Sequence, residues 1–170
     1  LFSSDDILLP GAITRAMKAV DEGEWDVFLM GVALCDLNMR PLHNHPILSC
    51  KESRSFHWSD SAQRADYFSR AQTSTAFFSF ISDIIVRRDR WLGVPVMDRF
   101  VGSCWIIAVQ LFAMSETPPG LLVRFDPHIY LLKRGDNDSF AAKGLISRIS
   151  LSIYGFRGIG RHFFGEDSFE

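Results

Sequence analysis

The sequence has 170 residues, a net charge of −2, and 47% hydrophobic and 22% charged residues. This length and composition predict one globular domain with enough apolar material for a core. The slightly negative charge argues against a protein that binds nucleic acid by neutralising phosphates, because such binding needs a basic surface. The 15 phenylalanines mostly neighbour apolar residues in the sequence, which favours a packed core over a base-stacking surface.

Cysteine usage and hydropathy indicate the compartment. The three cysteines, Cys35, Cys50 and Cys104, have neither the even number of a disulfide framework nor the spacing of a zinc site. No apolar run reaches the ~18 residues that span a bilayer, and no secretory signal is present. We therefore expect a reducing compartment, that is, a cytoplasmic protein.

Two adjacent carboxylates, Asp5 and Asp6, lie between an apolar beginning and Pro10. This order predicts the end of a strand, an acidic turn and a helix over residues 10–23, because proline fits the first turn of a helix. Adjacent carboxylates repel each other unless water or a cation lies between them, and Mg²⁺ and Mn²⁺ prefer oxygen ligands. Two interpretations stay open: the acidic turn caps the helix, or it binds a divalent cation.

Hydrophobic patterning predicts the elements that follow. A nearly continuous apolar run over residues 25–36 is typical of a strand buried on both faces. The chain is predicted to be irregular after Arg40 and to form a capped helix over residues 59–71. Residues 73–91 are compatible with a helix that runs into a strand.

The second half of the chain repeats this alternation. Apolar spacing predicts a helix over residues 104–114 and two strands over residues 121–125 and 129–132, which Asp126-Pro127 separates. A further helix is predicted over residues 141–154. Alternating strands and helices of this kind indicate an α/β fold with a sheet flanked by helices.

Residues 155–165 interleave aromatic residues with arginine and glycine. Such a segment could lie at a membrane surface. More often a segment of this kind packs back on its own domain. Peripheral membrane contact and internal packing are both open at this point.

A second polar stretch occupies residues 133–140. It places two cations, two carboxylates, an amide and a hydroxyl in eight residues after a predicted strand. This density suits a polar, hydroxyl-rich or phosphate-bearing ligand at the carboxyl end of a strand. It also suits a helix cap formed by Asp136, Asn137 or Asp138, and the two roles are compatible.

The acidic opening resembles the metal-binding D-x-D segment of family 2 glycosyltransferases. In that family a D-x-D-D run ends a central strand, and an l-x-p-g-x-l run opens the next helix. Here Ser3 stands where the first aspartate would be, so Asp5 matches the metal-binding aspartate and Asp6 follows it. Residues 80–88 and 134–140 are similar to further runs of bacterial glycosyltransferases related to abequosyltransferase, which add a deoxyhexose during O-antigen assembly.

This resemblance implies a partial GT-A fold, with a mixed sheet flanked by helices, in which residues 1–170 form the C-terminal part of a single catalytic domain. Because the chain begins at Leu1 within an apolar stretch, we expect a fragment whose N-terminal part lies upstream. The implied activity moves a hexose or deoxyhexose from a nucleotide-sugar donor to a hydroxyl of a lipid-linked or cell-surface glycan. The implied location is the cytoplasm, at the inner face of the membrane.

The resemblance also implies roles for individual residues. Asp5 and Asp6 would bind Mg²⁺ or Mn²⁺ on the donor diphosphate, and the other donor contacts would come from Ser4, Arg134 and Asn137. A carboxylate would take the proton of the acceptor hydroxyl, which is otherwise a poor nucleophile. The candidates for this general base are Asp98, Asp136 and Asp138.

Two departures from the family pattern keep another class of function open. Ser3 replaces an aspartate, and Ser103-Cys104 stands where many family 2 enzymes carry an acidic pair, with Asp98 as the nearest carboxylate. A non-catalytic glycan-binding or assembly module that retains the fold is therefore the alternative. A hydrolase with paired carboxylates is less favoured, because no acidic pair lies in apolar sequence away from a helix cap.

Overall fold

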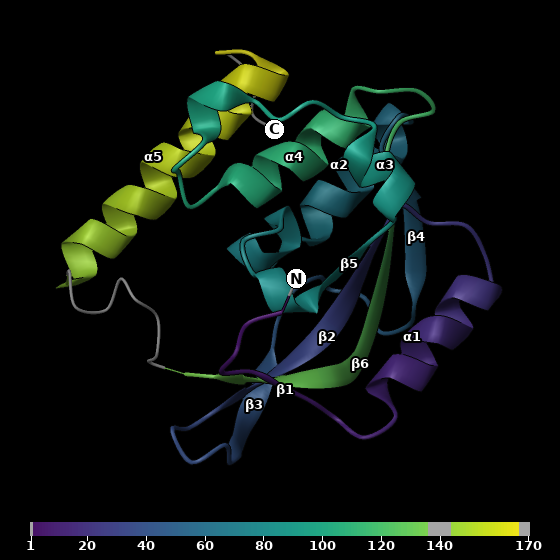
Figure 1. Cartoon of the computed structure of the whole chain (residues 1–170), viewed down its shortest axis with the longest axis vertical. Coiled ribbons are helices and arrows are strands. Elements are labelled where there is room, and N and C mark those ends of the chain that lie inside the picture. The colour runs from purple at the N-terminus through teal and green to yellow at the C-terminus, as the bar shows by residue number, and fades with distance from the viewer. Residues whose placement is uncertain (1, 136–143, 167–170) are drawn as a thin grey trace.

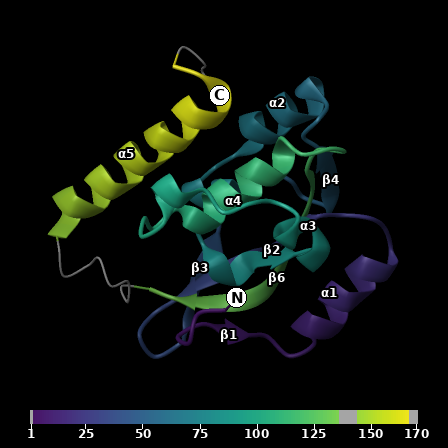
Figure 2. The same cartoon turned by 45° about the horizontal axis from the view of Figure 1, so that its top comes forward.

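The computed structural model describes residues 2–135 and 144–166 and shows a mixed α/β fold, as the alternation of elements predicted. Six strands form one curled sheet, and helices pack on both sides of it (Figures 1 and 2). In chain order, with short 3-10 helices labelled η, the elements are β1 (Ile7–Leu8), α1 (Ala12–Asp21), β2 (Val27–Cys35), β3 (Pro41–His45), β4 (Arg54–His57), α2 (Ser61–Arg70), η1 (Ser74–Phe77), η2 (Ile81–Asp83), β5 (Ile84–Val86), α3 (Arg88–Leu92), η3 (Asp98–Phe100), α4 (Ile106–Ser115), β6 (Leu122–Arg134) and α5 (Gly144–Phe164).

The parallel pair β2 and β6 forms the centre of the sheet. Each long strand has different antiparallel partners at its two ends: β6 pairs with β4 where it begins and with β1 where it ends, while β2 pairs with β5 and then with β3. β2 is buried along nearly its whole length, as its continuous apolar run predicted. β1 follows the acidic turn directly in the sequence. The end of β6 pairs with β1 and therefore lies close to that turn.

A bulge joins the two predicted strands at residues 121–125 and 129–132 into the single strand β6. The pairing with β2 shifts register around Gly31, and a Cβ at Gly31 would lie 2.3 Å from the carbonyl oxygen of His128. Asp126 accepts hydrogen bonds from the Tyr130 hydroxyl at 2.6 Å and from the His128 backbone N–H at 3.0 Å. The predicted break was wrong because these bonds satisfy the bulged residues and pairing continues beyond them.

Helices cover the two faces of the sheet unequally. α1 lies on one face, where Ala12, Ala16 and Ala19 are buried, whereas α2, α4 and α5 lie on the other (Figures 1 and 2). The Asp60 side chain caps α2 by accepting from the backbone N–H groups of residues 62 and 63, as predicted. A cluster of buried aromatic rings fills the space between the sheet and the larger helical layer: Phe56, Trp58, Tyr67, Phe78 and Phe112.

Other boundaries differ from the predictions. The strand expected before the acidic turn does not form in residues 2–6, and β1 follows the turn instead. Residues 41–45, predicted to be irregular, form β3, because their backbone groups pair with the end of β2. α5 continues to Phe164 instead of ending at Tyr154, although this part contains three glycines that disfavour a helix. Gly155 is required there, since a Cβ would lie 1.9 Å from Nε1 of Trp105. Tertiary contact with Trp105 thus compensates for weak helix propensity.

Within residues 2–135 and 144–166, no helix combines the length and the hydropathy needed to cross a bilayer.

Candidate functional site

A polar cleft of about 700 Å³ lies where the N-terminal turn, the end of β6 and the first half of α5 meet. We call it the acidic cleft. Its walls come from five parts of the chain that are far apart in the sequence. The lining residues are Ser3, Ser4, Asp5, Asp6, Ser74, Ser79, Phe80, Ile81, Cys104, Trp105, Lys133, Arg134, Arg148, Leu151 and Ser152.

The acidic turn is held against η2 by hydrogen bonds through one serine. Ser82 accepts from the backbone N–H of Ser3 at 2.9 Å, and its hydroxyl donates to Oδ2 of Asp6 at 2.6 Å. Within the turn, the Ser3 hydroxyl donates to Oδ1 of Asp5. Because Ser82 lies next to β5, the position of both carboxylates depends on the sheet rather than on the turn alone.

Asp6 is the more buried of the two carboxylates, with 9% of its surface exposed. Burial raises the pKa of Asp6 above its usual value, and the neighbouring charge of Asp5 raises it further. The Ser82 hydroxyl, the backbone N–H of Arg134 and the charge of Lys133 partly offset this rise. The acidic cleft therefore holds negative charge at an electrostatic cost, and a bound cation would lower that cost.

A third carboxyl, Asp83, lies close to the acidic cleft without being part of its wall. It is fully buried, and neither of its side-chain oxygens has a hydrogen-bond partner. Burial raises the pKa of Asp83 well above its usual value, and the charge of Lys133 partly opposes this rise. Because Asp83 does not line the cleft, it is not among the candidate metal ligands.

Three cationic side chains line the same cleft as the two aspartates: Lys133, Arg134 and Arg148. The Nζ atom of Lys133 lies 4.1 Å from the centre of the Phe80 ring. Nε of Arg134 is buried and has no hydrogen-bond partner. An unsatisfied guanidinium N–H beside a cluster of cations is suited to an anionic ligand such as a diphosphate.

The structure brings together four residues predicted from the sequence, Ser4, Asp5, Asp6 and Arg134, in the wall of the acidic cleft. Asp98 does not line this cleft. It lies in η3, whose Phe100 ring packs 6.0 Å from the ring of His162 in the second half of α5. The other predicted residues, Asp136, Asn137 and Asp138, lie outside the described residues.

The carboxylate ligands in the cleft are of the type that a hard divalent cation prefers, but there are few of them. Asp5 and Asp6 supply carboxylate oxygens, which Mg²⁺ and Mn²⁺ prefer. Among residues 2–135 and 144–166, no group of three or more His, Cys, Asp or Glu side chains is arranged to hold a metal ion. Ions of this kind commonly complete their coordination with water and ligand phosphates, so two carboxylates fit such a site.

Sequence reasoning missed several residues of this cleft and the serine that positions Asp6. Ser82 occurs in the segment that resembles family 2 enzymes, so its motif was a usable signal. Arg148 and Trp105 gave no signal, because one lies in a mostly apolar helix and the other reads as a core residue. Only the packing of α5 against the start of α4, where the Trp105 indole N–H donates to the carbonyl of Leu151 at 3.2 Å, brings them to the cleft.

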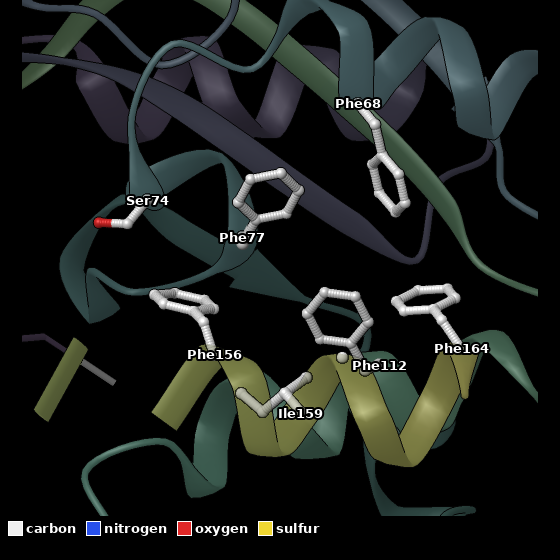
Figure 3. Close-up of a pocket in the computed structure, with 8 residues that line it drawn as sticks. Phe68, Ser74, Phe77, Phe112, Phe156, Ile159 and Phe164 are labelled. Atoms are coloured by element: carbon white, nitrogen blue, oxygen red, sulfur yellow. The ribbon is translucent and has the colours of Figure 1, made fainter. Parts of the chain in front are cut away.

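A second, apolar cavity of about 410 Å³ lies further along α5, and we call it the phenylalanine cavity. In Figure 3, rings from α2 and η1 point toward rings from α4 and α5. Its lining residues are Phe68, Ser74, Phe77, Phe112, Phe156, Ile159, Gly160 and Phe164. The second half of α5 thus packs on its own domain. This is the internal packing that was one of the two interpretations of residues 155–165.

The two cavities are neighbours. Ser74 lines both of them, and the ring of Trp105 in the acidic cleft lies 4.5 Å from the ring of Phe156 in the phenylalanine cavity. α5 is therefore a shared wall, polar where it meets the N-terminal turn and aromatic where it meets α2 and α4.

The sequence matches no model of a known protein family. It is 25% identical over 170 residues to the abequosyltransferase RfbV of Salmonella typhimurium strain LT2, an alignment that covers 98% of this chain and 50% of that protein. The chain thus spans about half the length of this curated relative. The similarity confirms the resemblance to a bacterial glycosyltransferase, and the mixed, curled sheet flanked by helices is consistent with a partial GT-A fold.

Proposed function

We propose that the protein takes part in glycosyl transfer, moving a hexose or deoxyhexose from a nucleotide-sugar to a hydroxyl of a lipid-linked or cell-surface glycan. The observation that carries this proposal is the acidic cleft, where two aspartates face a cluster of cationic side chains. A nucleoside diphosphate with its metal ion carries complementary charges: the cation suits the aspartates, and the phosphates suit the cationic side chains. The similarity to abequosyltransferase RfbV supports transfer as the reaction class.

Asp5 and Asp6 are the residues that would hold Mg²⁺ or Mn²⁺ against the donor diphosphate. When bound, such an ion stabilises the negative charge that builds on the leaving nucleoside diphosphate. The hydroxyl of Ser82 orients Asp6 for this role through its 2.6 Å hydrogen bond. The raised pKa of Asp6 predicts that metal binding weakens as the pH falls, because protons then compete for the carboxylate.

Lys133, Arg134 and Arg148, which line the same cleft, would bind the diphosphate oxygens. Arg134 contributes twice, since its backbone N–H supports Asp6 and its side chain keeps a buried, unsatisfied N–H. Ser4 and Asn137 complete the proposed donor contacts. Positive groups that are already in position when charge develops on the leaving group lower the barrier without reorganisation.

The general base would be a carboxylate that follows β6. Asp136 comes directly after Gly135 in the sequence and Asp138 follows two residues later, while Arg134, just before Gly135, lines the acidic cleft. Asp98 is the weaker candidate, because it does not line this cleft. A base at Asp136 or Asp138 would take the proton of the acceptor hydroxyl as the bond to the sugar forms.

We further propose a cytoplasmic location with peripheral membrane contact at the inner face. Cys35, Cys50 and Cys104 are free thiols, and a reducing compartment would keep them so. A lipid-linked acceptor would require access to the membrane surface.

A non-catalytic glycan-binding or assembly module is the second candidate. It is favoured by the absence, within the described residues, of a third metal-ligating side chain beside Asp5 and Asp6. The same cleft would then bind a charged glycan without transferring it.

A thermal-shift screen of nucleotide-sugars with and without Mn²⁺, followed by transfer or hydrolysis assays, separates the candidates. The transferase proposal predicts that one nucleotide-sugar raises Tm only with Mn²⁺, and that Asp5→Ala abolishes this shift and turnover. Ser115→Ala, at the end of α4 away from the cleft, should retain both. Full metal-dependent activity in Asp5→Ala would refute the metal role, and binding without any turnover would favour the module.

A further inference from the structure

The first half of α5 carries an apolar stripe that is exposed among the described residues, 2–135 and 144–166. Ile146, Ile149 and Ile153 recur at spacings of three and four residues, so they lie on one side of the helix. Their exposed fractions are 82%, 47% and 58%, and the adjacent Leu145 is 69% exposed. Figures 1 and 2 both show this half of α5 projecting beyond the other helices.

The same row continues into the phenylalanine cavity. Phe156, Gly160 and Phe164 extend the stripe at spacings of three and four residues, and all three line that cavity. The exposed isoleucines and the cavity therefore form one continuous apolar surface along α5. Isolated exposed apolar residues are normal on proteins, whereas a contiguous apolar surface of this length marks an interaction site.

The charges next to this stripe are positive. Residues 144–164 contain Arg148, Arg157 and Arg161 and no Asp or Glu. Arg157 and Arg161 are exposed, and the ion pair of Arg161 with Glu166 is long, at 3.5 Å, and largely exposed, so it is weak. An apolar face bordered by arginines is the pattern of helices that lie in the interface of an anionic membrane.

We infer that the exposed first half of α5 docks the protein on a bilayer that contains anionic lipids. Ile146, Ile149 and Ile153 enter the boundary between headgroups and acyl chains, and Arg157 and Arg161 contact lipid phosphates. The phenylalanine cavity offers an acyl chain an apolar place beside the stripe. Because Arg148 and Ser152 of the same helix line the acidic cleft, docking holds that cleft at the membrane surface; this consequence rests on the proposed function.

A lipid surface fits these residues better than a second copy of the chain. In a symmetric dimer through α5, the arginines that border one stripe would approach the arginines that border the other, and like charges at an interface oppose association. Lipid phosphates supply the opposite charge. The neighbouring η3 adds a further cation, since Arg99 stacks on Phe100 at 4.9 Å and Phe100 contacts His162 of α5.

Co-sedimentation with vesicles tests the inference without any assay of activity. The protein should bind vesicles of phosphatidylcholine with ~30% phosphatidylglycerol at least ~10-fold more tightly than pure phosphatidylcholine, and high salt should reduce the difference. Arg157→Gln combined with Arg161→Gln should abolish most of this preference. Equal binding to both vesicle types would overturn the inference.

A matched pair of variants tests the stripe itself. Ile146→Ser combined with Ile149→Ser should weaken vesicle binding by ~10-fold or more, because each serine removes apolar area from the interface. Ile13→Ser is the control, since Ile13 is 65% exposed on α1 at the other face of the sheet, and it should bind as the wild type does. Light scattering that shows a dimer disrupted by Ile146→Ser, or equal vesicle binding by all three proteins, would overturn membrane docking.

Failure of membrane docking can be distinguished from failure of the proposed function. The isoleucine variants should keep the wild-type Tm and its shift with nucleotide-sugar and Mn²⁺, because neither isoleucine lines the acidic cleft. A protein that binds vesicles but no donor would retain the docking surface while losing the proposed chemistry.

Discussion

The acidic cleft and the phenylalanine cavity share a wall, yet they are built in opposite ways. Both use α5, and Ser74 lines both. The cleft gathers carboxylates and cations whose interactions are incompletely satisfied: the pKa of Asp6 is raised, and Nε of Arg134 lacks a partner. The cavity gathers aromatic rings that contact one another edge to face, as Phe68 and Phe77 do.

This contrast separates the residues that stabilise the fold from those that are kept for a ligand. Incompletely satisfied polar groups reduce stability and persist where a ligand completes them. Aromatic packing adds stability and holds α5 against α4. Changes in the phenylalanine cavity should therefore act mainly on folding, and changes in the acidic cleft mainly on binding.

Phe112→Ala should have the largest effect on folding. Its ring is 3% exposed and packs against Trp58, Phe78 and Phe163 at centroid distances of 5.5 to 5.8 Å. Its removal leaves a cavity, so the free energy of unfolding should fall by about 3–5 kcal/mol in urea denaturation. Phe164→Ala, at the half-buried rim of the same cavity, should cost less. A loss below about 1 kcal/mol for Phe112→Ala would contradict the structural role of the cavity.

Gly155→Ala should have the next largest effect on stability. It tests the packing of α5 on Trp105, which separates the two cavities. The added Cβ would lie 1.9 Å from Nε1 of Trp105, so α5 must shift, at a cost of about 1–3 kcal/mol. The control is Gly158→Ala on the same helix, where nothing lies within 4 Å. That change should stabilise the protein by up to about 1 kcal/mol through helix propensity. The same sign for both variants in urea denaturation would argue against close packing of α5 on Trp105.

Arg148→Gln should weaken ligand binding. Loss of one charge-assisted contact to a diphosphate corresponds to about 1–2 kcal/mol, or roughly tenfold in Kd, measurable by titration calorimetry with the donor found in the screen. Arg157→Gln lies on the same helix outside the cleft and should leave this Kd unchanged. Equal losses in the two variants would indicate a general charge effect rather than a contact in the cleft.

Asp6→Asn should have a small effect on stability, and its sign should be positive. Because burial raises the pKa of Asp6 in the folded state, the wild type loses stability as the pH rises from about 4, the usual unfolded value, through the raised folded pKa. The variant should lack this loss and unfold about 0.5–1 kcal/mol less readily at pH 7, while losing its Mn²⁺-dependent shift.

Asp126→Asn is the contrasting variant for this pH dependence. Burial alone would raise the pKa of Asp126, but hydrogen bonds from Tyr130 and His128 outweigh it and lower that pKa. The wild-type carboxylate thus adds stability above about pH 4 that disappears as the pH falls through the lowered folded pKa, and the variant should be about 1–2 kcal/mol less stable at pH 7. Parallel urea curves from pH 3 to pH 8 should show opposite signs for the two variants.

Local patterns in the sequence predicted the elements whose signals are contained in a short window. The buried strand β2 followed from its apolar run, and the start of α2 followed from the cap at Asp60. Patterns failed where long-range pairing decided the outcome. β3 forms because residues 41–45 pair with β2, and β6 continues through its bulge because Gly31 leaves room for the backbone opposite it.

The candidate site divides in the same way. Asp5, Asp6 and Arg134 were predicted because carboxylates in a turn and cations after a strand are visible in one dimension, and a family resemblance gave them roles. Arg148 and Trp105 could not be predicted, since nothing in their neighbours points to the cleft. Asp98 was chosen for its place in the sequence, and η3 sets it away from the cleft lining.

By itself, the amino-acid sequence determined the α/β class, the acidic turn and the basic end of β6, because periodicity, charge and short motifs act over a few residues. Only the tertiary structure decided that these polar segments share a cleft with Arg148, and that α5 divides into an aromatic inner half and an exposed, apolar outer half. The physical reason is that strand pairing and helix packing join segments more than a hundred residues apart, and no local pattern encodes which partner each segment meets.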